Sequence, residues 1–513
     1  MFSLTPSRRR SVKILTIGGY SVMLIDIIQG LAFVPLYLHF IGERLYGLWL
    51  GTGGILAVLA FLDMGMASLT IQRVSREFGL KNYNGVSKYF FGGLLINTGF
   101  MSLLLIVGLI MSLGLGRFFP ETTVTENSLL TEAFQIALVA LIITLFNNTI
   151  EGTLNALQKP LMGKIFQLAG ALIGIIVVYF LLLGKDPLLA IPIGMLIRAA
   201  IGLVPNLFYL CLLFRFNNIR FWNYDKATVV DYLKLTPSLM LSKFGTSLVS
   251  NIEPTLINIF ISPEIAVYFS VTKKAGGLIR TILDRIGGVL YPSMVHLHAE
   301  EDKSKFNIFC IKLLNFIIPI TLVMFVTLII LNKPFVVLWV GKENYLGSLI
   351  TILISFSLFT SFVSNFLSYL ISTTGDIKFS SKAVFWESIV KMVLLFLMLW
   401  LFGINGLPIA IGVVGLVFSV IYLKRWNMHL QIDKDQLKTI LKEHLTYTFV
   451  MVGLGTVIFT ILNLWVQVYS ISIFIVISIV VLVIMTVALF ASSFTYKNFL
   501  ISKFNKTKKN GAS

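Results

Sequence analysis

Six basic side chains lie deep within long apolar stretches of the sequence, and their chemistry most needs an explanation. A charged side chain at the centre of a bilayer costs about 2.5–3.5 kcal/mol on insertion scales, so six of them facing lipid would cost on the order of 15 kcal/mol. We therefore expect these residues to face a protein-lined or water-filled interior. They are Arg198, Lys273, Lys274, Arg280, Arg285 and Lys391.

Four of the six lie within the apolar stretch 264–293, where helical spacing places them on one wide face. A helix turns by about 100° per residue, which places the polar residues of this stretch in two stripes. The first stripe holds Lys273, Gly277, Arg280 and Asp284. The second, about 100° around the helix, holds Lys274, Thr281 and Arg285. Arginine offers a planar fork to phosphate oxygens and lysine a mobile point charge. The pattern predicts a cationic cavity for a molecule with an anionic head and an apolar tail. The predicted binding residues are Arg198, Lys273, Lys274, Arg280 and Arg285.

Ion pairing, or snorkelling of long side chains toward the membrane surface, is the structural alternative for each basic residue. For Arg285, near the end of its apolar stretch, both interpretations stay open. For Lys391 an ion pair is favoured, because Glu387 precedes it by one helical turn.

Three acidic residues within apolar stretches are candidates for coupling or gating: Asp26, Asp63 and Glu253. Glu253 matches the predicted depth of Lys273 on the next, antiparallel helix, so a pair is expected there. Such a pair would serve function as a gate or as a proton or sodium site, or it would serve structure alone, with each charge neutralising the other. Asp26 is expected to line a cavity, whereas Asp63, two residues before Gly65, could serve packing alone.

No sequence pattern predicts a metal site or a cofactor. His296 and His298 are two residues apart and therefore do not share a helix face. The two cysteines, Cys211 and Cys310, are too few for a thiolate metal cluster. A nucleotide-binding motif is also missing from the sequence, so direct use of ATP is not expected.

Composition identifies the chain as an integral membrane protein. Of its 513 residues 57% are hydrophobic and only 12% charged, which is too little charge to cover a soluble protein of this size. A net charge of +18 would suit a nucleic-acid partner, but the positions of the charges argue instead for membrane orientation.

Apolar stretches of about 20 residues are long enough to cross a bilayer, and fourteen are predicted. They span 13–38, 45–71, 89–114, 131–153, 162–183, 188–213, 236–261, 264–293, 307–331, 346–372, 383–402, 405–423, 445–466 and 470–493. With the N-terminus inside, the cytoplasmic segments hold 30 Lys and Arg residues and the outside loops hold 5. This asymmetry predicts that both termini are cytoplasmic.

An internal repeat adds to this picture. An outside hairpin, a long helix and a charged loop make up 40–82, and the same plan returns at 261–304, six helices later. We therefore predict an all-α protein with two six-helix lobes related by a pseudo-two-fold axis along the membrane normal. The expected divisions are an N-lobe (1–220), a C-lobe (221–430), and two further helices with a basic cytoplasmic tail (431–513).

The segment from Pro35 through Gly42, Tyr46-Gly47-Leu48-Trp49 and on to Asp63-Met64-Gly65 resembles the start of the Wzx-type polysaccharide flippases. Tyr268 and Tyr291-Pro292 agree in the second half. Those O-antigen and exopolysaccharide repeat-unit flippases belong to the multidrug/oligosaccharidyl-lipid/polysaccharide (MOP) exporter superfamily. The resemblance implies a non-enzymatic flippase of the bacterial cytoplasmic membrane that carries undecaprenyl-diphosphate-linked oligosaccharide by alternating access. Membrane lipids and polysaccharide polymerase or assembly proteins would be further partners, and nucleic acid would not.

The sequence fits other functions of membrane proteins less well. A drug or metabolite antiporter of the same superfamily is disfavoured by the cationic stripe, which would repel cationic drugs. A polyprenyl-linked glycan enzyme is disfavoured because the longest outside loop, 116–130, offers Glu121 and Glu126 but no basic partner beyond Arg117. A lipid II flippase is disfavoured because the sequence lacks the paired basic residues expected near the start of such proteins. A purely structural scaffold protein is disfavoured because it would leave the charges within the apolar stretches unexplained.

The predicted topology can be tested with reporter fusions. Fusions at 403–405 and 466–470 should read as external, and fusions at 425–438 should read as cytoplasmic, because the basic residues mark the inner side. Alkaline phosphatase and green fluorescent protein activities would measure this. A cytoplasmic signal from 466–470 would contradict the last two spans.

Overall fold

The computed structural model describes the chain apart from residues 1–7, 64, 121, 235, 237–251, 300–302, 431–433, 466–469 and 493–513. It consists of two compact units, Met1–Val267 (unit 1) and Tyr268–Ser513 (unit 2). Within the described residues the regular structure is entirely helical, which confirms the predicted all-α class.

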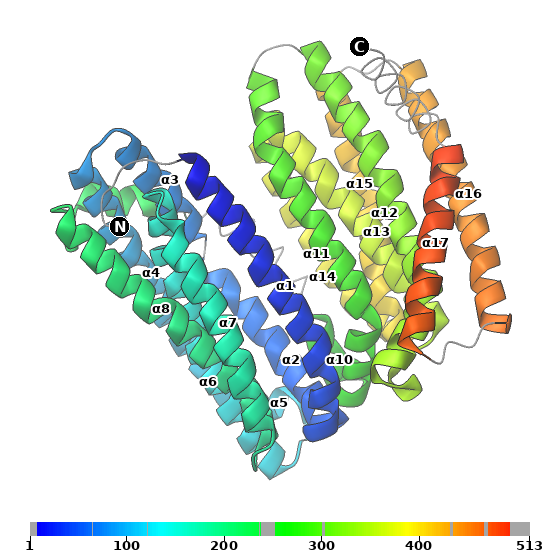
Figure 1. The fold of residues 1–513 in the computed structure, drawn as a ribbon, viewed down its shortest axis with the longest axis horizontal. Helices are drawn as coiled ribbons and strands as arrows, with labels where there is room; N and C mark the ends of the chain where they lie inside the picture. The colour runs from blue at the N-terminus through cyan, green and yellow to red at the C-terminus, as the bar shows by residue number, and fades with distance from the viewer. Residues whose placement is uncertain are drawn as a thin grey trace. The chain divides into compact units, whose positions relative to one another are not determined.

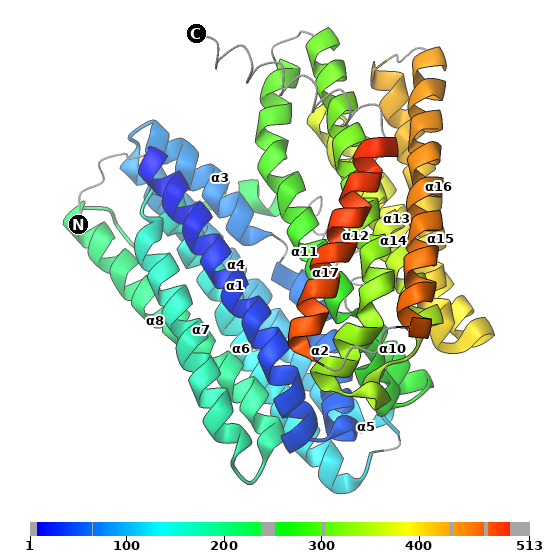
Figure 2. The ribbon, with the colours of Figure 1, turned by 45° about the vertical axis from the view of Figure 1, so that its right-hand side comes forward.

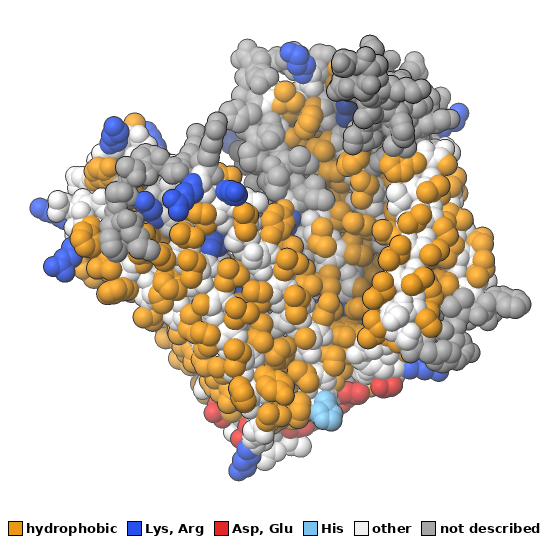
Figure 3. Space-filling view, in the orientation of Figure 1, with side chains coloured by type: hydrophobic (Ala, Val, Ile, Leu, Met, Phe, Trp, Pro, Cys, Tyr) orange, Lys and Arg blue, Asp and Glu red, His pale blue; other side chains and the backbone are white. Residues whose placement is uncertain are grey.

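Unit 1 is formed by long helices joined by short turns (Figure 1). The helices are α1 (Arg8–Phe40), α2 (Glu43–Leu59), α3 (Met66–Gly79), α4 (Tyr83–Leu113), α5 (Leu115–Phe118), α6 (Val124–Ala156), α7 (Pro160–Leu182), α8 (Ala190–Phe216) and α10 (Glu253–Phe260), with a further helical segment at 226–234. Helices α4, α6 and α8 enclose a core around Phe90, Ile150 and Phe214. Hydrophobic side chains cover the visible flank of these helices, and Lys and Arg side chains gather around the end where α1 begins (Figure 3).

The helices of unit 2 follow the same pattern. They are α11 (Pro263–Ala299), which begins in unit 1, α12 (Lys303–Val340), α13 (Ser348–Thr373), α14 (Ile377–Phe402), α15 (Gly406–Leu430), α16 (Lys434–Trp465) and α17 (Ile471–Ser492). Helices α11 to α15 share one core around Phe366, Tyr422 and Trp426. The last two helices, α16 and α17, pack on α12 through a second core around Val326, Tyr447 and Met485. Both views show α17 running along α12 (Figure 2).

The helices agree with the predicted membrane spans at nearly every position. Eleven helical stretches of the described chain are long and apolar enough to cross a membrane, and one of them, Lys378–Met428, contains two predicted spans. Helix α11 is long enough but too highly charged to count among the eleven. Most of the predicted seventh span, 236–261, lies outside the described residues, and only its end appears as α10.

The second predicted span, 45–71, corresponds to the candidate span Glu43–Gly79, but the helix within it is not continuous. It ends at Leu59 and passes through a short 3₁₀ turn, Ala60–Asp63, before α3 starts at Met66. Gly65 has a φ of 72°, the left-handed region that glycine adopts without strain. The Asp63 and Gly65 motif therefore marks a break in the helix.

Helix α10 lies so close to α2 that two of its side chains form hydrogen bonds with backbone carbonyls of α2. Thr255 Oγ1 donates to the Gly51 carbonyl at 2.7 Å, and Asn258 Nδ2 donates to the Gly47 carbonyl at 2.9 Å. A Cβ at Gly47 would overlap the carbonyl of Pro263. The Tyr46-Gly47 motif thus permits close approach of two backbones.

A pair of glycine substitutions in α2 tests this packing. Gly47→Ala should destabilise the protein by about 1–3 kcal/mol, because the added methyl meets backbone that cannot move aside cheaply. Gly53→Ala is the matched control, since its Cβ would meet no described atom within 4 Å and alanine is the better helix former. Thermal melting in detergent would compare the two. A Gly47→Ala protein as stable as the Gly53→Ala protein would contradict the close approach.

Candidate functional site

Helix α11 carries most of the predicted binding residues and has one packed and one open face. On the packed face Thr272 and Leu283 are fully buried, and a Cβ at Gly276 would overlap Leu358. On the open face an added Cβ at Gly277 would meet no described atom within 4 Å, while Thr281 and Arg285 are exposed. A polar group approaching α11 within unit 2 therefore finds its space beside Gly277.

Arg280 is held by partners within unit 2. Its Nε donates to both carboxylate oxygens of Asp284 at 2.9 Å, and its Nη1 donates to the Leu358 carbonyl at 3.2 Å. The guanidinium also lies 5.4 Å from the centre of the Phe362 ring. The Arg280 side chain is 14% exposed and the Asp284 side chain 45%, so the acid is the more accessible member of the pair.

Lys273 and Lys274 lie side by side on α11 with different surroundings. The Lys273 ammonium is 5.9 Å from the centre of the Phe269 ring. Lys274 is partly buried, and no residue in the described part of the chain forms a hydrogen bond or an ion pair with it. A partly buried ammonium group without such a partner favours an anionic ligand.

Arg198 and Asp26 form an ion pair in unit 1. Arg198 Nη1, on α8, donates to Asp26 Oδ1, on α1, at 2.7 Å. Helix α7 permits the approach, because Gly170 and Gly174 leave no Cβ against the backbone of α8 near Arg198. The two side chains are 33% and 45% exposed, so a second polar group can reach the pair.

A second ion pair of unit 1 did not follow from the sequence. Lys164 Nζ, on α7, donates to Glu151 at 2.7 Å and to Gln167 at 2.8 Å. Lys164 lies about one turn inside α7, which begins at Pro160. Glu151 within the apolar stretch was the signal that could have indicated this pair, since an acid there needs a partner.

Both remaining acidic candidates are buried in unit 1. Asp63 lies in the 3₁₀ turn that breaks the second span, and Glu253 occupies the first turn of α10 before Pro254. Glu253 belongs to unit 1 and Lys273 to unit 2, so their pairing stays a prediction. The gathering of Arg198 and the basic residues of α11 around one cavity also stays a prediction.

Lys391 is part of a buried polar cluster in unit 2. Lys391 Nζ lies 3.2 Å from Glu387 Oε1, and the two side chains are 8% and 5% exposed. Ser364 donates to the same carboxylate at 3.0 Å, and Tyr422 donates to its other oxygen at 3.0 Å. This cluster connects α13, α14 and α15, and the favoured interpretation of Lys391 as an ion-pair residue agrees with it.

The described residues contain no group of three or more His, Cys, Asp or Glu side chains arranged to hold a metal ion. Cys310 is buried and Cys211 exposed, and both are free thiols. The chemistry available at the candidate site is therefore that of charged and hydrogen-bonding side chains on membrane-spanning helices.

Solved structures with a similar fold include a flippase and multidrug transporters. The chain is similar to the lipid II flippase MurJ in an inward closed conformation, with 14% identity, a TM-score of 0.68, and coverage of 93% of this chain and 98% of that one. It is also similar to an inward-facing multidrug resistance MATE transporter of the MOP superfamily (15% identity, TM-score 0.60, 82% and 98% coverage). A MATE transporter from Vibrio cholerae gives 14% identity, a TM-score of 0.54, and coverage of 83% and 98%.

The chain belongs to the family described as polysaccharide biosynthesis protein, whose sequence model matches residues 10–298. No curated protein sequence matches it significantly. The fold, which is that of MOP-superfamily transporters, agrees with the predicted resemblance to that superfamily. The protein is thus a multi-pass membrane protein of the polysaccharide biosynthesis family with the fold of MOP transporters.

The buried pair of unit 2 gives a test of how charge is balanced there. Lys391→Met should destabilise the protein by about 3–5 kcal/mol, because it leaves the Glu387 carboxylate buried without a cation. Adding Glu387→Gln should restore most of the loss, since the neutral amide needs no cation; its oxygen accepts from one of the Ser364 and Tyr422 hydroxyls, and its NH2 group donates to the other. Unfolding in detergent would be followed for both variants. A double variant less stable than Lys391→Met would show that the pair is not the source of the loss.

Proposed function

We propose that this protein is a Wzx-type flippase that moves an undecaprenyl-diphosphate-linked oligosaccharide across the bacterial cytoplasmic membrane. The observation that carries the proposal is the family match over residues 10–298, which connects the chain with polysaccharide biosynthesis. The fold supports it further, because one of the similar structures is a lipid II flippase. Export rather than catalysis is the proposed role.

Lys274 is the residue best placed to receive the diphosphate head. A partly buried ammonium group without an ion pair among the described residues is stabilised when an anion enters. Gly277, one turn along α11, leaves open space beside it. Lys273 and Arg285 add positive charge to the same helix.

Arg280 and Arg198 would act by exchanging one anion for another. Each guanidinium is bonded to a carboxylate whose side chain is 45% exposed. A diphosphate offers the same fork geometry with more charge, so it can displace Asp284 or Asp26 from its arginine. The displaced acid is then available for protonation, which gives Asp26 a coupling role and adds Asp284 as a coupling candidate. Asp63 and Glu253 stay proposed gating residues.

The proposed cycle is a rocking movement of the N-lobe, 1–220, against the C-lobe, 221–430, driven by an ion gradient or the membrane potential. The sequence carries no nucleotide motif to power it directly. Both termini are proposed to be cytoplasmic, with glycan polymerase or assembly proteins receiving the cargo on the outer side.

A drug or metabolite antiporter is the second candidate function, since MATE transporters share the fold. The difference between the two lies in the charge that the site accepts. An unpaired lysine on α11 favours an anionic head over a cationic drug.

Substitutions on α11 test the proposed site. Lys274→Ala, Lys273→Ala and Arg280→Ala should each reduce translocation about tenfold or more, because one charge-assisted contact contributes about 1.5–3 kcal/mol. Arg280→Lys should recover only part of the activity, since the planar fork is lost. Translocation of undecaprenyl-diphosphate-linked glycan would be measured in proteoliposomes.

Lys185→Ala, in the turn after α7, is the control and should transport normally. Normal translocation by the Lys274→Ala and Arg280→Ala proteins would overturn the site. Efflux of a cationic drug, with no glycan movement, would support the antiporter instead.

A further inference from the structure

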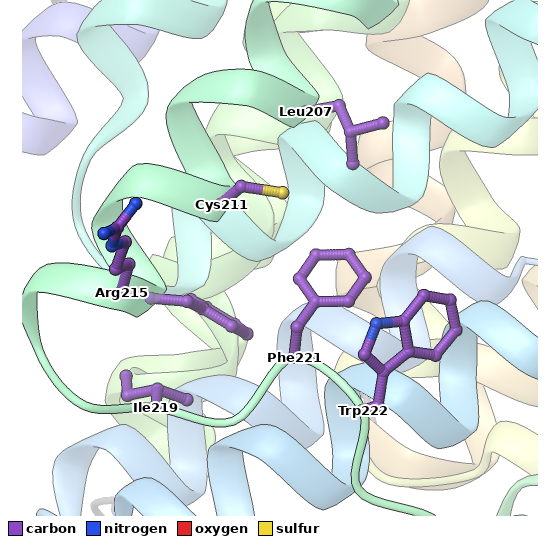
Figure 4. A pocket seen from close by; sticks show the side chains of 7 residues that line it. Leu207, Cys211, Arg215, Ile219, Phe221 and Trp222 are labelled. Atoms are coloured by element: carbon purple, nitrogen blue, oxygen red, sulfur yellow. The ribbon is translucent and has the colours of Figure 1, made fainter.

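A pocket of about 420 Å³ lies in unit 1 at the end of α8, and none of the predicted binding or coupling residues lines it. This volume falls within the roughly 300–1,000 Å³ of ordinary small-molecule sites. Figure 4 shows Leu207 and Cys211 on the helix facing Phe221 and Trp222 on the segment that follows it, with Arg215 at the rim. The Cys211 sulfur points toward the space between the helix and this segment.

Aromatic side chains make the apolar wall of the pocket firm. The Phe221 ring packs edge-on against Phe90 at 5.0 Å and lies 6.0 Å from Phe214. Trp222 packs against Phe91 at 5.2 Å and yet remains 73% exposed. The wall is therefore preformed, and an apolar chain could enter without displacing its rings.

Arg215, which lines the pocket, and Arg220, which directly precedes the lining residue Phe221, carry positive charge that this part of the protein does not neutralise. Within the described residues, neither Arg215 nor Arg220 has a side-chain hydrogen bond or an ion pair. The nearest acid along the chain, Asp225, accepts from the Thr228 hydroxyl at 2.6 Å and pairs with Lys88 at 3.3 Å. Hydrogen bonds from Thr228, followed by Lys88, hold the pKa of Asp225 below its usual value, so this carboxylate is already engaged.

The surroundings of the pocket are those of a membrane surface. Helix α8 belongs to the candidate span Pro187–Phe216, so Arg215 lies at the very end of that span. Close to Arg215 in the sequence, Phe216 and Trp222 are 63% and 73% exposed. Exposed tryptophan in particular is common at the boundary between lipid and water. Arginine at such a boundary extends toward the headgroups.

We propose that this pocket binds an anionic phospholipid of the surrounding leaflet, with an acyl chain between Cys211 and Phe221 and the headgroup phosphate at Arg215. The apolar space fits the chain, and the guanidinium fork fits the phosphate. Basic pockets between helices at the membrane surface bind anionic headgroups in this manner. A bound lipid would contact both α8 and the segment 217–224, and would thereby stabilise the connection between α8 and the helical segment 226–234.

Native mass spectrometry of the full chain in detergent, titrated with phosphatidylglycerol or phosphatidylethanolamine, tests the site. Wild-type protein should retain one phosphatidylglycerol in preference to phosphatidylethanolamine. Arg215→Gln should weaken phosphatidylglycerol binding about tenfold, whereas Arg215→Lys should keep part of the preference. Cys211→Phe should weaken both lipids by filling the pocket.

Arg76→Gln is the matched control, because Arg76 is an exposed arginine at the end of α3 that does not line the pocket. Equal loss in Arg76→Gln and Arg215→Gln would overturn the proposal by showing a diffuse charge effect. Unchanged phosphatidylglycerol binding in Arg215→Gln, or full binding in Cys211→Phe, would overturn it as well. Gel filtration and thermal melting would establish that each variant is folded, so that a change in lipid binding reports on the pocket.

Discussion

The structure depends above all on the cost of placing a charge inside a membrane. Several charged side chains on the described helices are bonded to an opposite charge, in some cases on another helix. Arg198 and Asp26 connect α8 with α1, and Lys164 and Glu151 connect α7 with α6. Since a misplaced helix would leave both members of a pair exposed to lipid, these bonds select one register for each pair of helices. Lys274 has no such partner among the described residues, and its place on α11 beside Gly277 makes it part of the candidate site.

Close packing of small residues and backbone provides the second constraint. Lipid chains are as apolar as leucine, so helices in a membrane gain little from burying leucine and more from close contact and hydrogen bonds. The bonds from Thr255 and Asn258 to the backbone of α2 show this clearly, because they depend on Gly47 and Gly51 having no side chain. Such constraints involve few positions, which explains how transporters only 14–15% identical share the fold.

The sequence predicted most of the helices and only part of the site. Length and hydropathy predicted where the spans lie, because a bilayer core needs about 20 apolar residues. Several helices extend well beyond the predicted stretch, as α12 does to Val340 and α16 does from Lys434, because a helix can continue past the apolar region. The pairing of Lys391 with Glu387 was predictable, since both lie on one helix a single turn apart. The pairing of Arg198 with Asp26 was not, because 172 residues separate them and only packing brings them together. The break after Leu59 escaped prediction for a similar reason: the apolar pattern continues across it, and only the left-handed backbone at Gly65 reveals it.

That break has a mechanical meaning. A continuous α-helix resists bending because each turn is bonded to the next, and the turn Ala60–Asp63 together with Gly65 interrupts this ladder. The first half of the span is fastened to α10, and the second half, α3, packs on α4 and α6. The span therefore behaves as two rigid rods in series joined by a compliant element. A force applied to α2 would change the angle between α2 and α3 at this joint. Only a few backbone torsions, those of the turn Ala60–Asp63 and of Gly65, set the stiffness of the joint.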